Sequence, residues 1–277
     1  MTDFTKILEF MSILVYNHKR FGGILMNDIE LLNKKGLTKY QNSIDHPISF
    51  FFMSIMAGFY LGGALILSNT LGAVFQQVSP EVAKLLSAFS FGVGLVAITS
   101  LGGELFTGNC FTTFIPVLDK KLPWYKLITP WIICFIGNVI GLGFIVILFY
   151  YSGSMRELLH DYVLNGIYTK LNVSLGQVIL RSILCNFMVC LAAFASMKIS
   201  DGFTRTTIMF LFVMAFVFSS MEHCIANAGT YTLGLCYQFN WTQVTHILGH
   251  MFICTIGNII GGSFLFAIPL YLSNKKI

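Results

Sequence analysis

Three ionisable side chains interrupt long apolar stretches of the sequence: Glu104, Glu222 and His223. An ionisable group at membrane depth is costly, and one that is kept there usually serves a function. An unperturbed histidine titrates near physiological pH, so its ring can donate a hydrogen bond or a proton to a passing anion. A bare anion in a dry pore suffers a large desolvation cost, which is far smaller for a protonated weak acid. His223 therefore predicts chemistry suited to the passage of a small weak-acid anion, provided that the surrounding elements enclose a pore.

The composition predicts that those elements span a membrane. The chain has 277 residues, of which 56% are hydrophobic and only 10% are charged, whereas a soluble domain carries about a quarter charged residues. Residues 48–80, 127–155 and 224–274 contain no aspartate, glutamate, lysine or arginine. A bilayer-spanning helix needs about 20 consecutive apolar residues. We therefore expect an all-α membrane protein.

The apolar segments divide into six expected transmembrane helices: 48–70, 83–118, 127–151, 178–197, 206–235 and 244–272. The second is interrupted near 99–109 and the fifth around 222–229, and such breaks in corresponding places point to a binding site near the membrane midplane. We expect a six-helix channel domain over 46–277. Before it, a cytoplasmic N-terminal segment over 1–45 is expected to be amphipathic, because apolar residues recur there at helical spacing: Ile7, Leu8, Met11, Leu14 and Val15.

Lysine and arginine are distributed unevenly between the predicted loops. With the N-terminus inside, the outer loops hold only Lys84, Arg156 and Lys170, with Arg181 near the outer end of the fourth span. All other lysines and arginines fall on the cytoplasmic side, which positive charge favours. The sequence thus predicts a multi-pass protein of the plasma (inner) membrane with both termini in the cytoplasm.

Two motifs recur in the same order in the two halves of the chain. Residues 136–141 (IGNVIG) recur as 256–261 (IGNIIG) at an offset of 120, and residues 104–109 (ELFTGN) match 222–227 (EHCIAN) at an offset of 118. These matches predict a repeated three-helix unit, and because three is odd the second copy must be inverted in the membrane. We expect the polar residues of the motifs to support the helix breaks: Glu104, Glu222, Asn109, Asn227, Asn138 and Asn258.

Other polar residues have less decisive patterns. His223 has a leucine as its repeat counterpart, so internal symmetry does not require it, which favours a role in a pore. Lys170 either attracts anions or is an ordinary interfacial lysine, and Arg181 either extends outward or faces a cavity. His246 and His250 have the spacing of metal ligands, but no acidic residue lies between them and no third ligand is evident. We expect no metal and no cofactor.

The chain resembles the formate/nitrite transporter family over nearly its whole length, from His46 and Pro47 to the end. Four motifs carry the resemblance by their order and spacing: residues 103–109 (GELFTGN), 186–190 (NFMVC), 222–227 (EHCIAN) and 257–262 (GNIIGG). The first motif looks more like the nitrite and hydrosulfide members than the formate members. The resemblance implies an aquaporin-like six-helix protomer that assembles as a homopentamer with one pore per protomer.

The resemblance also implies roles for individual residues. His223 would be the central pore histidine, with Thr107 hydrogen-bonded near it. Lys170, sixteen residues before Asn186, would be the vestibule lysine, and Asn186 a polar group lining the pore. Apolar side chains would line the rest: Phe91, Leu95 and Leu105 at the constriction on the cytoplasmic or loop side, and Phe216 and Val189 along the wall.

The expected function is passive or proton-coupled permeation of formate, nitrite, hydrosulfide or a similar small anion, not an enzymatic reaction. The expected partners are the anion, the lipid bilayer and further copies of the chain, with no nucleic acid. A membrane-embedded haem or metal redox protein is an alternative, which requires paired histidines on facing helices. A water or glycerol channel is a third, but the paired Asn-Pro-Ala signatures of that fold do not occur.

Overall fold

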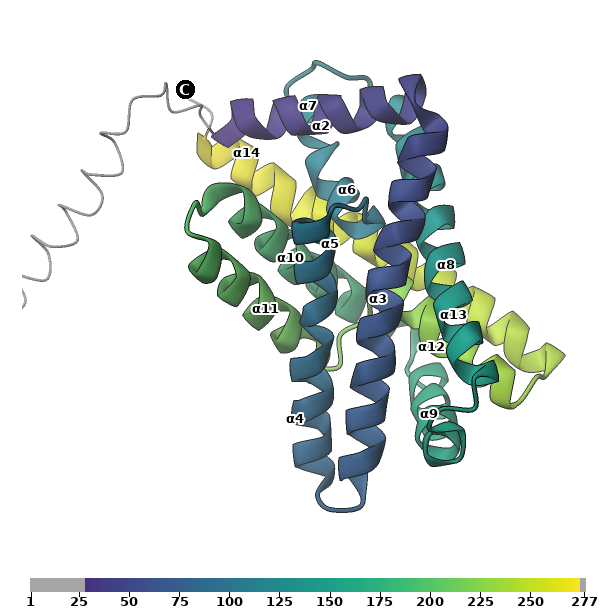
Figure 1. Ribbon diagram of the computed structural model, residues 1–277. Helices are drawn as coiled ribbons and strands as arrows, with labels where there is room; N and C mark the ends of the chain where they lie inside the picture. The colour runs from purple at the N-terminus through teal and green to yellow at the C-terminus, as the bar shows by residue number, and fades with distance from the viewer. Residues whose placement is uncertain (1–27, 275–277) are drawn as a thin grey trace, which may run out of the picture.

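The computed structural model describes residues 28–274, and all regular elements within that range are helices (Figure 1). In chain order they are α2 (Asp28–Asp45), α3 (Pro47–Gln76), α4 (Pro80–Phe91), α5 (Val93–Leu101), α6 (Phe106–Thr112), α7 (Ile115–Leu118), the 3-10 helix η1 (Trp124–Leu127), α8 (Ile128–Tyr151), α9 (Arg156–Leu171), α10 (Leu175–Lys198), α11 (Gly202–Phe218), α12 (Cys224–Tyr237), α13 (Trp241–Ile260), the π-helix η2 (Gly261–Ala267) and α14 (Ile268–Asn274).

Within the described part of the chain, five helical stretches are long and apolar enough to cross a membrane: Pro47–Gln76, Pro80–Leu101, Trp124–Tyr151, Leu175–Lys198 and Trp241–Asn274. Two shorter apolar stretches, Phe106–Leu118 and Gly202–Phe218, accompany them. The predicted fifth span, 206–235, corresponds to α11 and α12, neither of which is long enough to belong to the five. The prediction of an all-α fold is confirmed for residues 28–274, and five of the helical stretches have the length and apolar composition of membrane spans.

Helical backbone stops within the second and fifth predicted spans. α5 ends at Leu101 and α6 begins at Phe106. Between them Gly102 has a φ of +88°, a conformation open to glycine because it lacks a Cβ. α11 ends at Phe218 and α12 begins at Cys224, with Ser220 at a φ of +55° in the intervening loop. Backbone groups released at membrane depth need other partners, and the side chains that supply them surround the candidate site.

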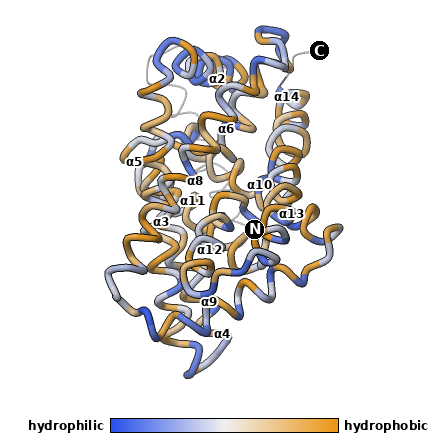
Figure 2. The backbone as a smooth tube through the Cα atoms, turned by 90° about the vertical axis from the view of Figure 1, so that its right-hand side faces the viewer, coloured by the Kyte–Doolittle hydropathy of each residue, from blue (hydrophilic) through white to orange (hydrophobic). Residues whose placement is uncertain are grey.

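The helices α2 and α9 lie at opposite ends of the molecule (Figure 1). Hydrophilic residues gather at these two ends and hydrophobic residues lie between them (Figure 2), as expected for a protein that crosses a bilayer. α2 forms the part of the predicted N-terminal segment from residue 28 to 45. The amphipathic pattern between Ile7 and Val15 lies outside the described residues.

Glycines of the repeated motif allow two pairs of helices to approach closely. A Cβ added to Gly141 on α8 would lie 2.2 Å from the carbonyl oxygen of Ile55 on α3. A Cβ added to Gly261, directly after α13, would lie 2.2 Å from the carbonyl oxygen of Ile183 on α10. Small residues permit such backbone contact between helices in membranes. The same sequence feature therefore produces the same helix contact twice.

Candidate functional site

Residues between 28 and 274 line three neighbouring cavities along the interior of the helical bundle. The largest, here called the large vestibule, has a volume of about 490 Å³, and its lining includes Lys170, Glu222 and His223. The smallest, the central void, has about 10 Å³ and is lined by Leu61, Phe91, Leu95, Leu105, Val189, Val213, Phe216 and His223. The third, the small vestibule, has about 80 Å³, and its lining includes Lys39, Thr99 and Asn109.

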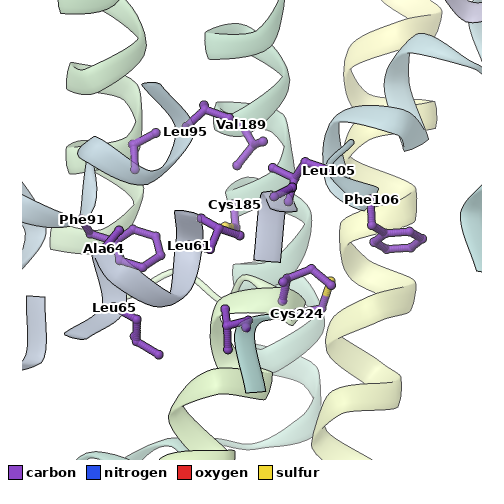
Figure 3. Packing of buried hydrophobic residues seen from close by; sticks show 14 of the residues in the cluster. Leu61, Ala64, Leu65, Phe91, Leu95, Leu105, Phe106, Cys185, Val189 and Cys224 are labelled. Atoms are coloured by element: carbon purple, nitrogen blue, oxygen red, sulfur yellow. The ribbon is translucent and has the colours of Figure 1, made fainter. Parts of the chain in front are cut away.

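Neighbouring cavities share lining residues, so together they define one path. The large vestibule and the central void share three side chains: Phe91, Phe216 and His223. The central void and the small vestibule share three others: Leu95, Leu105 and Val189. Figure 3 shows these last three at one level, with Phe91 and Leu61 at the next. A void of about 10 Å³ holds at most one water molecule, so in this conformation its side chains close the path.

His223 is the one polar side chain among the eight described residues that line the central void. It is only 4% exposed and occupies the N-cap position of α12. Its ring stacks on Phe216, with centroids 5.9 Å apart and planes inclined by 17°. Its Nε2 lies 3.1 Å from the hydroxyl oxygen of Thr107. The interruption between α11 and α12 thus brings a hydrogen-bonding ring to an otherwise apolar passage.

The backbone of α12 determines which nitrogen of His223 carries the proton. The N–H of Ala226 donates to Nδ1 over 3.1 Å, so Nδ1 must present its lone pair. A neutral ring then carries its proton on Nε2, and Nε2–H donates to the Thr107 hydroxyl oxygen. A doubly protonated ring would give up this cap and place a positive charge at a helix N-terminus, where the helix dipole disfavours it.

Asn138 on α8 supplies partners for the first interruption. Its Nδ2 donates to the carbonyl oxygens of Ser54 and Glu104, at 2.8 Å each. Its Oδ1 accepts from the N–H of Phe106, the first residue of α6, at 2.9 Å. The amide therefore ties α3, the loop and α6 together.

Asn258 on α13 makes the corresponding contacts at the second interruption. Its Nδ2 donates to the carbonyl oxygens of Ser182 and Glu222, at 2.7 and 2.9 Å. Its Oδ1 accepts from the N–H of Cys224, the first residue of α12, at 2.8 Å. Each of the three bonds has its match at Asn138, so the repeated motif supports both interruptions in the same way.

Each buried glutamate of the motif is paired with a lysine. Glu222 Oε2 lies 2.8 Å from the Nζ of Lys170 on α9 and 2.7 Å from the Nδ2 of Asn227. Glu104 pairs with Lys39 on α2. Lys170 lines the large vestibule and Lys39 the small one. From sequence Lys39 is expected only to be one of the cytoplasmic charges, although its place before α3 matches that of Lys170 before α10.

Two predicted pore residues lie behind the cavity walls. Asn186 on α10 is fully buried and lines none of the three cavities. Its Nδ2 donates to the carbonyl oxygens of Asn258 and Thr107, at 2.6 and 3.2 Å. Thr107 is also fully buried and reaches the path only through His223. In this structure Asn186 therefore braces α6 against α13. The pore-lining role that the resemblance implies for it stays a prediction.

Phe91 lies on a different side of the central void from the leucines with which the sequence analysis grouped it. It faces the large vestibule together with Phe216, and the two rings are 6.4 Å apart in an edge-to-face arrangement. Leu95 and Leu105 face the small vestibule. Leu61 and Val213, which the sequence analysis did not name, complete the wall. Phe91 is the last residue of α4 and Leu95 lies one helical turn further along the chain, in α5, so the two side chains lie at different levels of the path.

The histidines of α13 differ in their surroundings. His246 is exposed, whereas His250 is buried with its Nδ1 at 3.0 Å from the hydroxyl of Tyr231. Within residues 28–274 no three His, Cys, Asp or Glu side chains are grouped so that they could hold a metal ion.

Long apolar helices and an interior path closed by apolar side chains are features of a membrane channel or transporter. The sequence pattern of the formate/nitrite transporter family matches residues 27–272. The chain belongs to this family, which confirms the resemblance seen in its motifs. The predicted likeness to the nitrite and hydrosulfide members in particular stays a prediction.

The chain is similar to characterised and uncharacterised members alike. It is 27% identical to the uncharacterized transporter YwcJ of Bacillus subtilis over 248 residues, which cover 89% of this chain and 97% of that protein. It is 29% identical to the formate channel FocA of Escherichia coli over 249 residues, which cover 82% and 87%.

Two solved structures have the same fold. An FNT family ion channel matches with a TM-score of 0.80 at 22% identity, over 90% of this chain and 99% of that one. A pentameric formate channel with formate bound matches with a TM-score of 0.69 at 24% identity, over 83% and 98%.

Proposed function

We propose that the chain is a channel for small monovalent anions of weak acids, namely formate, nitrite or hydrosulfide, with one pore in each protomer. The observation that carries the proposal is the position of His223, in the wall shared by the large vestibule and an otherwise apolar central void. Membership of the formate/nitrite transporter family supports the substrate class.

In the proposed mechanism the anion takes the place of Thr107 as the acceptor of the His223 Nε2–H bond. Because Ala226 holds Nδ1, the ring keeps its one proton directed at Thr107 and the path. An anion leaving the large vestibule exchanges part of its hydration shell for this bond, which lowers its desolvation cost. Apolar side chains on either side exclude water and bulkier solutes: Phe91 and Phe216 at one constriction, and Leu95, Leu105 and Val189 at the other.

The remaining motif residues keep this geometry in place. Asn138, Asn258 and Asn186 hold the interrupted backbone, and the glutamate–lysine pairs fix the loops from both ends of the path. Lys170 also presents N–H donors to anions in the large vestibule. Asn227 supports Glu222, and Asn109 occupies the equivalent place in the small vestibule.

We propose an aquaporin-like protomer of six spans in two inverted three-helix repeats. In this arrangement α3, α4 to α6, and α8 correspond to α10, α11 with α12, and α13. The matched contacts of Asn138 and Asn258 support it. The repeats interlock, since α8 packs on α12 and α6 on α13.

We further propose a homopentamer in the plasma (inner) membrane with both termini in the cytoplasm. The pentameric formate channel of the same fold supports the assembly. The orientation rests on the lysine and arginine bias, which puts α2 and the small vestibule inside and α9 outside. Large apolar side chains on the outer faces suit contact with lipid or a neighbouring protomer, among them Phe52, Ile132, Ile136, Leu180 and Phe252.

Flux of formate, nitrite and hydrosulfide into proteoliposomes, at one acidic and one neutral pH, tests the proposal. His223→Ala removes both the donor and the cap, whereas His223→Asn retains a good N-cap residue. We expect rapid flux of at least one of the three anions through the wild type, and its loss in both variants. Wild type without flux, or variants that match it, would overturn the proposal. A Soret band in the purified protein would favour the haem alternative.

A further inference from the structure

The large vestibule carries more positive charge than the other end of the path. Its lining contains three cationic side chains, Lys84, Lys170 and Arg181, and one carboxylate, that of Glu222. The lining of the large vestibule therefore has a net charge of +2. The small vestibule has Lys39 as the one charged residue of its described lining, and Lys39 is paired with Glu104. The surplus of charge lies at one end only.

Lys170 does not supply this surplus, because its ammonium is 2.8 Å from Glu222 Oε2 and the two charges largely cancel at a distance. Arg181 has no such partner: within residues 28–274 no carboxylate lies within ion-pair distance of its guanidinium. Lys84 is exposed, with its Nζ 5.2 Å from the centroid of the Phe218 ring. Arg181 and Lys84 therefore carry the uncompensated charge of the large vestibule.

The architecture does not require an arginine at position 181. The N–H of Glu222 donates to the carbonyl oxygen of Arg181 over 3.4 Å. In the other half of the chain, the N–H of Glu104 donates to the carbonyl oxygen of Met53 over 3.1 Å. Arg181 and Met53 are thus equivalent backbone acceptors, and a methionine serves as well for that contact. Of the two equivalent acceptor positions, only position 181 therefore carries a charged side chain.

We propose that Arg181, assisted by Lys84, forms an anion-capture site in the large vestibule, which concentrates small carboxylates and other monovalent anions ahead of His223. This inference rests on the proposed function. Arginine stays charged at every physiological pH, and its planar fork binds a carboxylate through two hydrogen bonds. In a cleft with low-dielectric walls, such a charge raises the local concentration of anions and the rate at which they enter.

The test is the half-saturating formate concentration for flux into proteoliposomes, at low and at high ionic strength. Arg181→Met introduces the residue type found at the equivalent position, Met53. Arg181→Gln provides a second neutral variant, and Arg181→Lys keeps the charge. Arg156→Met is the control, because Arg156 is exposed at the same end and lines none of the three cavities.

We expect both neutral variants to raise half-saturation about threefold to tenfold at low salt with the maximal rate retained. The difference should shrink at high salt, where charges are screened beyond about 8 Å at 0.15 M. Arg181→Lys keeps the charge but loses the two-hydrogen-bond fork, so its half-saturation should fall between those of wild type and the neutral variants. Arg156→Met should be close to wild type. Equal half-saturation in wild type and Arg181→Met at both ionic strengths, with flux still lost in His223→Ala, overturns the capture site and leaves the channel standing. An arginine that only anchors α10 at the bilayer surface would give that result with a lowered thermal stability. Wild type without flux overturns both.

Discussion

The imidazole of His223 and the hydroxyl of Thr107 meet across the two halves of the chain: 3.1 Å separates Nε2 from Oγ1, although 116 positions lie between the residues. Each residue sits at the start of a helix that follows an interruption, in α12 and α6. The two interruptions thus converge on one hydrogen bond.

Thr107→Val removes the acceptor of the Nε2–H bond while conserving the shape of the side chain. A buried donor left unsatisfied costs about 1–3 kcal/mol, and the ring loses its orientation toward the path. We expect about a tenfold fall in maximal formate flux. Thr107→Ser should keep most of the flux. Thr232→Val on α12 is the control, since its hydroxyl donates to the Ala228 carbonyl and it lines none of the three cavities; a loss of flux as large there would contradict the assigned role.

Lys170 and Glu222 should behave as a unit in a double-mutant cycle. The Glu222 side chain is 3% exposed and that of Lys170 27%, so removing one partner leaves a charge in a poorly solvated place, at a cost of about 3–5 kcal/mol. We expect Lys170→Met and Glu222→Gln each to lower the thermal stability of the detergent-solubilised protein. The variant with both changes should be more stable than the sum of the two losses predicts. Additive losses would show that the pair is not coupled.

The glycine contacts should tolerate no added methyl group. Gly141→Ala and Gly261→Ala each place a Cβ 2.2 Å from a backbone carbonyl oxygen, so the helices must separate, at about 1–3 kcal/mol. We expect both variants to unfold at lower temperature and to assemble poorly. Gly249→Ala on α13 has open space around the new Cβ and serves as the comparison. If it destabilises as much as Gly261→Ala, then helix packing at Gly261 is not the cause.

Asp119 joins α2 to the C-terminal helix and predicts a pH dependence at that end of the molecule. It accepts hydrogen bonds from Asn33 and Tyr271, at 2.7 and 3.1 Å, and pairs with Lys121 at 2.8 Å. The hydrogen bond from Lys121, followed by those from Tyr271 and Asn33, lowers the pKa of the carboxyl. A lowered folded-state pKa means that the contribution to stability is complete above the unfolded value of about 3.9. It is lost as the pH falls through the lower folded-state value.

The corresponding measurement is the thermal midpoint of wild type and Asp119→Asn across a pH series. We expect the variant to be less stable at neutral pH, with a difference that disappears as the pH falls below about 4. Asp45→Asn, at an exposed aspartate that ends α2, should show no such difference. A gap between wild type and Asp119→Asn that persists in acid would rule out the carboxylate as its source.

The helices and the polar residues at their interruptions can be predicted from the sequence, because a bilayer requires long apolar helices with satisfied backbone groups. Long apolar runs predict the helices, and the repeated motifs predict which polar residues lie at the breaks, since Glu104 and Glu222 occupy equivalent positions. The match between Lys39 and Lys170 is hidden in the sequence because the loops before α3 and α10 differ in length. The family resemblance alone implies that Asn186 lines the pore. Its neighbours, the carbonyls of Thr107 and Asn258, come from distant segments that only the folded chain brings together.

The interlocking of the two halves has a consequence for how the chain is made. The hydroxyl of Ser263 in η2 donates to the carbonyl of Cys110 in α6 over 2.8 Å, across 153 positions, and Asn186 reaches α6 from α10. During synthesis α6 therefore enters the membrane long before the residues that satisfy its backbone have left the ribosome. An unsatisfied backbone group is costly in lipid. We therefore expect the first half of the nascent chain to remain incompletely folded, and in contact with the insertion machinery, until η2 has been synthesised. Truncation anywhere before η2 should then yield a product cleared by membrane quality control, not a half-sized pore.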